Sequence, residues 1–272
     1  GIDPIVSYKY TCRQLVDLTN DQASNWRLLQ QLKEQFQADT TDFSPYYASF
    51  AKLLLQEFVE DYTENAESYH TSISDTTLFH HIINNLKLSF GDYEREKAIY
   101  DNYVALSSIY DFENKPQFIR YGIGHLEKSR ATFQNYSFFF TRLIENEIYT
   151  KDEIITVMGY LTNSEVIWDV LYDDDGNYKS YTTEAGFGIS DYWREYFRGV
   201  KKLKQNKLSD LTLFQLNTKD SPYQVGKPDL VEIRMLFSAS NSKIVKGKPT
   251  TDFVDYAILI SDSEASQPID AM

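Results

Sequence analysis

Apolar residues recur at every third or fourth position through most of residues 1–110, and Asp, Glu, Gln and Lys fill the positions between them. This spacing brings the apolar side chains onto one face of a helix and the charged ones onto the other. The pattern predicts amphipathic helices over residues 8–18, 25–36, 46–64, 75–88 and 92–106. We therefore expect a mainly helical portion over residues 1–110, whose leucines and phenylalanines form a core.

Beyond residue 110 the apolar runs are shorter and richer in β-branched and aromatic residues, which is typical of strands. Strands are predicted over residues 118–125, 166–172, 178–182, 211–216 and 254–260, while residues 153–161 fit either a strand or the start of a helix. The Asp-Gly step in Asp173-Asp174-Asp175-Gly176-Asn177 predicts a hairpin turn between the strands that flank it. These strands define a sheet-containing portion over residues 111–272.

Two other segments of this portion carry their own patterns. Residues 191–203, with Trp193, Tyr196 and Phe197, predict an aromatic amphipathic helix, and residues 238–251 predict a polar loop. Strands and helices follow one another without a sharp change in composition, which predicts one α/β domain over residues 1–272.

The charge balance narrows the classes of partner. The chain has 27 basic and 40 acidic side chains, a net charge of −13, which argues against nucleic acid and anionic membrane as partners. The basic residues from Lys201 to Lys204 are interpreted as a solvated helix end. No apolar run approaches the roughly 20 residues needed to span a bilayer. The single cysteine, Cys12, excludes an intrachain disulfide and suits a cytoplasmic protein, or an exported one whose signal has been removed.

His125 is the best candidate for chemistry. It follows Gly122-Ile123-Gly124 at the end of the strand predicted over residues 118–125, where α/β sheets collect ligands. Glycines allow another group to approach the backbone closely, and imidazole serves in acid–base chemistry and ligation. On the residues alone, a hydrogen-bonded structural histidine is the commoner outcome for such a position.

A second set of candidates lies on the helix predicted over residues 92–106. Arg95, Glu96 and Asn102 occupy positions i, i+1 and i+7, so Arg95 and Asn102 lie two turns apart on one face and can be aimed at the same place. The alternative, favoured on spacing alone, is an exposed charged helix with pairs at i, i+3 and i, i+4.

Motifs for metals and cofactors are absent from the sequence. His80 and His81 point about 100° apart on a helix and form no metal pair. Gly122-x-Gly124-His125 lacks the third glycine and the acidic partner of a dinucleotide fingerprint. The aspartates near Gly176 lack the spacing of a calcium loop. We therefore predict no metal, no cofactor, and a small-molecule ligand or substrate as the partner, with the oligomeric state left open.

Three elements in order resemble the second half of the erythromycin-esterase-like family, part of a wider group with haem-uptake lipoproteins and Tiki-type proteases. They are Arg95-Glu96 followed by Asn102, Gly122-x-Gly124-His125 after a strand, and Phe253-x-Asp255-Tyr256-x-Ile258 followed by Pro268, and the similarity spans residues 85–270. The resemblance implies a mixed or mostly parallel β-sheet flanked by helices, with the active cleft at the strand ends. It also implies a histidine acting as general base on water, with Glu and Arg residues positioning the substrate.

Carried over to this sequence, His125 matches the second His of the family's His-Asn-x-His motif and becomes the catalytic residue. Arg95 matches the Arg of its Arg-Glu helix, and Arg95, Glu96, Asn102 and Gly124 become substrate-binding residues. Gly122 stands where the esterases have the first His. The family's Gly-Glu-x-x-His element, which supplies the principal base, does not occur in these 272 residues. We expect it to precede Gly1, so the 272 residues are expected to be a fragment with little or no hydrolysis of macrolides or simple esters.

Two functions from different classes follow. The first is an esterase-like hydrolase relative, degenerate or incomplete, in which His125 and Arg95 face a cleft. The alternative is a non-catalytic binding protein for a haem-like or other small ligand, with His125 as a ligand and tyrosines lining the pocket. A structural or interaction domain with His125 buried is a third.

Overall fold

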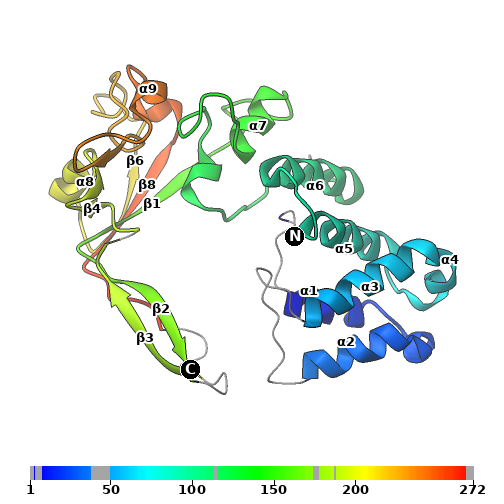
Figure 1. Cartoon of the computed structure of the whole chain (residues 1–272). Helices are drawn as coiled ribbons and strands as arrows, with labels where there is room; N and C mark the ends of the chain where they lie inside the picture. Colours follow the sequence, from blue (N-terminus) through cyan, green and yellow to red (C-terminus); the bar gives the residue numbers. More distant parts are fainter. Residues whose placement is uncertain are drawn as a thin grey trace. The chain divides into compact units, whose positions relative to one another are not determined.

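The computed structural model describes residues 3, 8–37, 50–112, 115–173, 178–186 and 188–267. The chain divides into two compact units, Gly1–Lys115 and Pro116–Met272. Helices make up the first unit, and all strands among the described residues belong to the second (Figure 1). The predicted α/β class, with a helical N-terminal region and a mixed sheet flanked by helices, is confirmed.

Each predicted amphipathic helix is present in the first unit. The α-helices are α1 (Tyr8–Asp17), α2 (Arg27–Gln37), α3 (Phe50–Glu64), α4 (Ala66–Tyr69), α5 (Thr76–Ser89) and α6 (Arg95–Tyr110), with 3₁₀ turns η1 (Asp21–Asn25) and η2 (His70–Ser72). The predicted start of the third helix, residues 46–49, lies outside the described residues. Asp75 caps α5 by accepting the Leu78 N–H at 2.9 Å.

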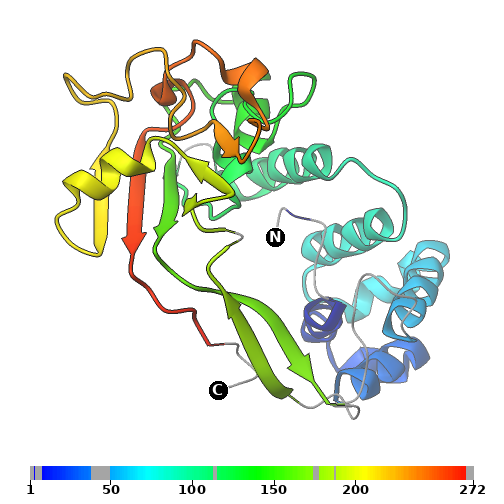
Figure 2. The same ribbon diagram turned by 60° about the vertical axis from the view of Figure 1, so that its left-hand side comes forward.

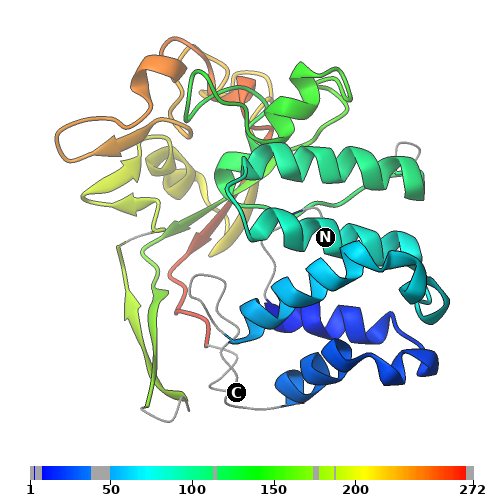
Figure 3. The ribbon, with the colours of Figure 1, turned by 45° about the vertical axis from the view of Figure 1, so that its right-hand side comes forward.

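The core of the first unit lies between α1, α2, α3 and α5. Its largest fully buried members include Tyr8, Leu29, Phe58, Phe79 and Leu86. These side chains come from the apolar faces that the three-to-four spacing creates. Each helix therefore buries one face, and these faces together form the hydrophobic core of the first unit. α6 lies beside α5 (Figure 3), where the Asn102 amide donates to Asn85 Oδ1 at 2.7 Å.

The second unit is built on a three-stranded mixed sheet of order β1-β8-β6. β1 (Val157–Thr162) runs parallel to β8 (Tyr256–Ser261), with Tyr160 opposite Leu259, and β6 (Leu211–Gln215) is antiparallel to β8 (Figure 2). Burial alternates along β1 and β8, which places Met158, Tyr160, Ala257 and Leu259 in one core. Residues 153–161 therefore end in a strand.

Two smaller sheets complete the strands of this unit. β2 (Val166–Tyr172) and β3 (Tyr178–Glu184) form the predicted antiparallel hairpin, which extends away from the three-stranded sheet (Figure 2). Residues 174–177 of its predicted turn lie outside the described residues. β4 (Asp191–Tyr192), β5 (Glu195–Phe197) and β7 (Ile233–Met235) form the other sheet.

Short helices surround these strands, and two predictions about them need correction. They are α7 (Phe139–Glu145), α8 (Val200–Asn206), α9 (Ser242–Val245) and the 3₁₀ turns η3 (Ile123–Leu126) and η4 (Thr250–Asp252). The predicted loop over residues 238–251 thus contains helical turns. The predicted helix over residues 191–203 is wrong in its first half, because Glu195–Phe197 pairs with β7, a partner 38 residues along the chain at Tyr196–Arg234.

The predicted strand over residues 118–125 is also wrong. Among the described residues this segment pairs with no strand, and the Phe118 side chain is 94% exposed. The chain is irregular up to Gly122 and then closes a 3₁₀ turn in which the His125 N–H donates to the Gly122 carbonyl at 3.0 Å. His125 therefore follows a loop, not a strand.

Candidate functional site

His125 lies within η3 with its imidazole half-buried between aromatic rings. The ring centroid is 4.7 Å from that of Tyr121 and 5.4 Å from that of Phe138. A Cβ at position 122 would lie 3.4 Å from the imidazole Cδ2, and one at position 124 would lie 3.9 Å from the Phe138 ring. Gly122 therefore borders the imidazole, and Gly124 borders the Phe138 ring.

Glu127, two residues after His125, is a buried carboxyl that sequence reasoning missed. Its side chain is 6% exposed, and Oε2 has no hydrogen-bond partner among the described residues. Desolvation raises the pKa of Glu127 to about 8, so the group is largely protonated at neutral pH. In the sequence, Glu127-Lys128-Ser129 resembles an exposed polar turn, and no local pattern signals that it is buried.

Tyr160 on β1 shares this environment. Burial, with the nearby Glu127 as a smaller cause, raises the pKa of its phenol far above the usual range. The Tyr160 hydroxyl donates to the Leu230 carbonyl at 2.7 Å. The Thr141 hydroxyl in turn donates to the main-chain carbonyl of Glu127 at 2.7 Å, which fixes the chain where it leaves η3.

Lys128 makes a buried ion pair that holds this segment to the sheet. Its Nζ donates to Asp255 Oδ1 at 2.8 Å and to the carbonyls of Lys151 and Ile154 at 2.9 and 3.1 Å. Asp255 Oδ2 accepts the Thr156 N–H at 2.9 Å. Every donor of the ammonium group is used, so we assign Lys128 and Asp255 to anchoring rather than to catalysis.

Arg95, Glu96 and Asn102 lie on α6 in the first unit, whereas Gly124 and His125 lie in the second. Arg95 begins α6 and forms a bidentate ion pair with Asp3, with Nε 3.2 Å from Oδ1. The Glu96 side chain is 3% exposed, in contrast to the alternative of a fully exposed charged helix. The Asn102 amide bonds to α5, so the two residues predicted to share a target contact different partners.

Groups suited to metal binding are not assembled among the described residues. They contain no cluster of three or more His, Cys, Asp or Glu side chains arranged to hold a metal ion. Cys12 is fully buried, and desolvation raises the pKa of its thiol to about 12, which makes it unreactive at neutral pH. In the part of the chain that is described, no helix is long and apolar enough to cross a membrane.

No protein-family model and no curated protein sequence matches the chain. Among solved structures, the chain is similar to an erythromycin esterase, the EreC mutant in its open conformation. The similarity covers 100% of this chain and 70% of that chain, at 9% sequence identity and a TM-score of 0.48. A likeness at this level assigns no activity and no site residue.

Proposed function

We propose that this chain is an esterase-like hydrolase in which His125 acts as general base on water. The position of the imidazole carries the proposal: it is half-buried between Tyr121 and Phe138, and the neighbouring Gly122 presents no side chain to it. Imidazole is the side chain that most often takes the proton from attacking water. The order of the motifs around Arg95, His125 and Tyr256 supports the same function.

The protonation state of Glu127 is a second observation that supports an acid–base reaction. Its carboxyl retains a proton at neutral pH because it is desolvated, so it is suited to give a proton rather than take one. Groups whose environment perturbs their protonation cluster at functional sites. We propose that the protonated Glu127 carboxyl serves as a proton donor near the segment that carries His125.

The remaining site residues keep the roles that the resemblance implies. Arg95, Glu96, Asn102 and Gly124 stay predicted substrate-binding residues, and the substrate stays a small-molecule ester. The absence of a Gly-Glu-x-x-His element from these residues predicts slow hydrolysis, since the principal base of the resembled family is missing from them.

The test is to incubate the protein at high concentration with a macrolide lactone and with simple carboxylic esters. Mass spectrometry measures the hydrolysis products. We expect a slow reaction that falls about a hundredfold or more in His125→Asn, because a general base contributes on that scale. His70→Asn, at an exposed histidine of the first unit, is the matched control and should keep the rate.

Equal rates for His125→Asn and the unsubstituted protein would contradict the proposal. A haem titration tests the alternative, a small-ligand binding protein. Absence of hydrolysis, together with a Soret shift that is lost in His125→Ala, would replace the hydrolase with a small-ligand binding protein.

A further inference from the structure

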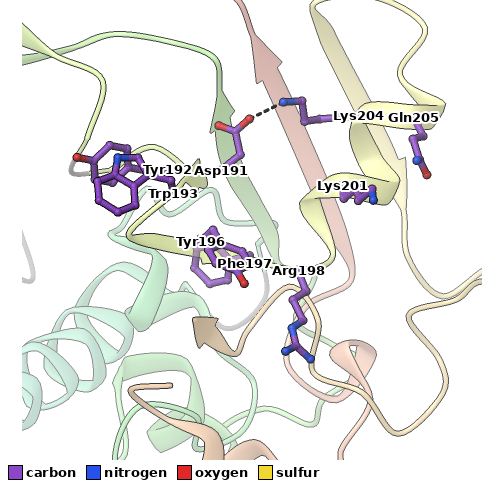
Figure 4. Close-up of a pocket in the computed structure, with 9 residues that line it drawn as sticks. All are labelled: Asp191, Tyr192, Trp193, Tyr196, Phe197, Arg198, Lys201, Lys204 and Gln205. Atoms are coloured by element: carbon purple, nitrogen blue, oxygen red, sulfur yellow. Dashed lines mark hydrogen bonds and ion pairs between the residues drawn. The ribbon is translucent and has the colours of Figure 1, made fainter. Parts of the chain in front are cut away.

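A pocket in the second unit combines aromatic and cationic side chains (Figure 4). It has a volume of about 750 Å³, within the range of small-molecule sites. The lining residues come from β4 and β5, the turn that joins them, the link between β5 and α8, and helix α8 itself. Those that matter for a ligand are Asp191, Trp193, Phe197, Arg198, Lys201 and Lys204.

The pocket carries an excess of positive charge. Lys204 is paired with Asp191, whose Oδ2 lies 2.5 Å from Nζ, and Asp191 Oδ1 accepts the Asn163 N–H at 3.1 Å. Arg198 and Lys201 make no ion pair with any residue that the structure describes. Three cations and one carboxylate leave two positive charges in the pocket of a chain whose net charge is −13.

The aromatic side of the pocket is exposed to solvent. The Trp193 side chain is 58% exposed, and its ring centroid is 5.9 Å from that of Tyr192. The guanidinium of Arg194 lies 4.6 Å from the indole centroid. Phe197, by contrast, is held against Tyr160 of the core, at 5.5 Å between centroids. Figure 4 shows the Trp193 indole next to Tyr192 and apart from Phe197, and an exposed indole offers a platform on which a planar ligand can stack.

We propose that this pocket binds a phosphate monoester that carries an aromatic ring, the chemistry of a nucleoside monophosphate. The ring stacks on Trp193, and the phosphate lies against Arg198 and Lys201. A phosphate monoester carries roughly −1.5 to −2 charges at pH 7, which matches the two uncompensated cations. Guanidinium groups bind phosphate through paired donors, and this favours Arg198 as the main anchor.

A single mononucleotide is favoured over a nucleic-acid strand. Strand binding requires a basic groove that follows many phosphates, and its salt dependence grows with their number. Here the described cations of the pocket come from one short segment, residues 198–204, on a strongly acidic chain. The proposal stands apart from the hydrolase function, since none of the pocket residues belongs to that site.

Isothermal titration calorimetry with adenosine monophosphate tests the site. We expect saturable one-to-one binding, weaker by about tenfold or more for adenosine and for inorganic phosphate, because each lacks one half of the recognised ligand. An oligonucleotide of about six residues without a terminal phosphate should bind more weakly than adenosine monophosphate, because each internal phosphodiester carries one negative charge and a phosphate monoester carries roughly −1.5 to −2. Tighter binding of that oligonucleotide than of the monophosphate would overturn the proposal in favour of a strand.

Variants locate the two halves of the ligand. Arg198→Gln with Lys201→Gln should weaken monophosphate binding at least about tenfold and leave adenosine binding unchanged, whereas Trp193→Ala should weaken both. Lys243→Gln, at an exposed lysine of the same unit outside the pocket, is the matched control. Far-UV circular dichroism checks folding. Absence of monophosphate binding, or equal affinity in the double variant and the control, would overturn the site.

Discussion

Among single residues, Glu127 stands out because the pKa of its carboxyl is raised far above the usual value. Its pKa is about 8 in the folded chain, against 4.5 for a glutamate in water, because burial penalises the charged carboxylate. Below about pH 4.5 both folded and unfolded chains hold the proton. Between about 4.5 and about 8 the unfolded chain releases it and the folded chain keeps it, so the free energy of unfolding decreases as the pH rises through this window.

Replacing this carboxyl with an amide should remove that dependence. We expect Glu127→Gln to match the unsubstituted protein near pH 5 and to exceed its stability near pH 8.5 by a few kcal/mol, since each unit of pKa difference corresponds to about 1.4 kcal/mol. Urea unfolding at the two pH values measures it. Glu195→Gln, at an exposed glutamate, is the control. Parallel stability curves for Glu127→Gln and the parent would refute the raised pKa.

At the scale of elements, the segment from η3 to Lys128 is held by contacts to residues far along the chain. The Lys128 N–H donates to the Phe253 carbonyl at 3.0 Å, and its ammonium group pairs with Asp255 just before β8. These bonds position η3, and with it His125, against the three-stranded sheet. The buried Lys128–Asp255 ion pair is thus one of several bonds that hold the segment.

Breaking this pair should be costly. Lys128→Met leaves the largely buried Asp255 carboxylate without its cation, and we expect a loss of about 3–5 kcal/mol in the free energy of unfolding. Lys207→Met removes an ammonium group that pairs with Asp210 and Asp262 near the surface, where both carboxylates stay in contact with water, and should change little. Chemical denaturation of both variants measures the difference. A small effect of Lys128→Met would show that the ion pair does not hold the segment.

Some elements are specified by local sequence periodicity, and others by strand pairing between distant residues. The helices of residues 8–110 follow from the local three-to-four periodicity, because one apolar face per helix is enough to specify them. The first half of residues 191–203 and the segment 118–125 differ from their predicted structures because long-range pairing decides whether a strand forms. Pairing of β5 with β7 overrides the helical spacing in the first segment, and no strand among the described residues pairs with the second, so its apolar run remains a loop.

At the scale of the whole molecule, each of the two units has a hydrophobic cluster of its own. One cluster contains Phe58 and the other Phe253, both fully buried, and the two share no member. Each unit therefore has the apolar interior that an independently packed body requires.

Substitutions in the two clusters should act on different parts of the chain. Phe58→Ala and Phe253→Ala are each expected to cost about 3–5 kcal/mol through lost burial and a cavity. Hydrogen exchange read by mass spectrometry should show faster exchange within residues 8–112 for the first and within residues 116–267 for the second. Leu53→Ala, at an exposed leucine, is the control. Faster exchange spread equally over both ranges would contradict two separate cores.

Short-range periodicity and the chemistry of single side chains are enough to predict the helical first portion, the α/β class and the hairpin strands, and they make His125 a candidate for chemistry. The folded chain alone reveals that Glu127 and Lys128 are buried, that Arg95 pairs with Asp3, and that residues 191–205 contribute an aromatic, cationic pocket. Burial and pairing are set by residues distant in sequence, and a carboxyl or an ammonium group has the same letter whether water or a core surrounds it.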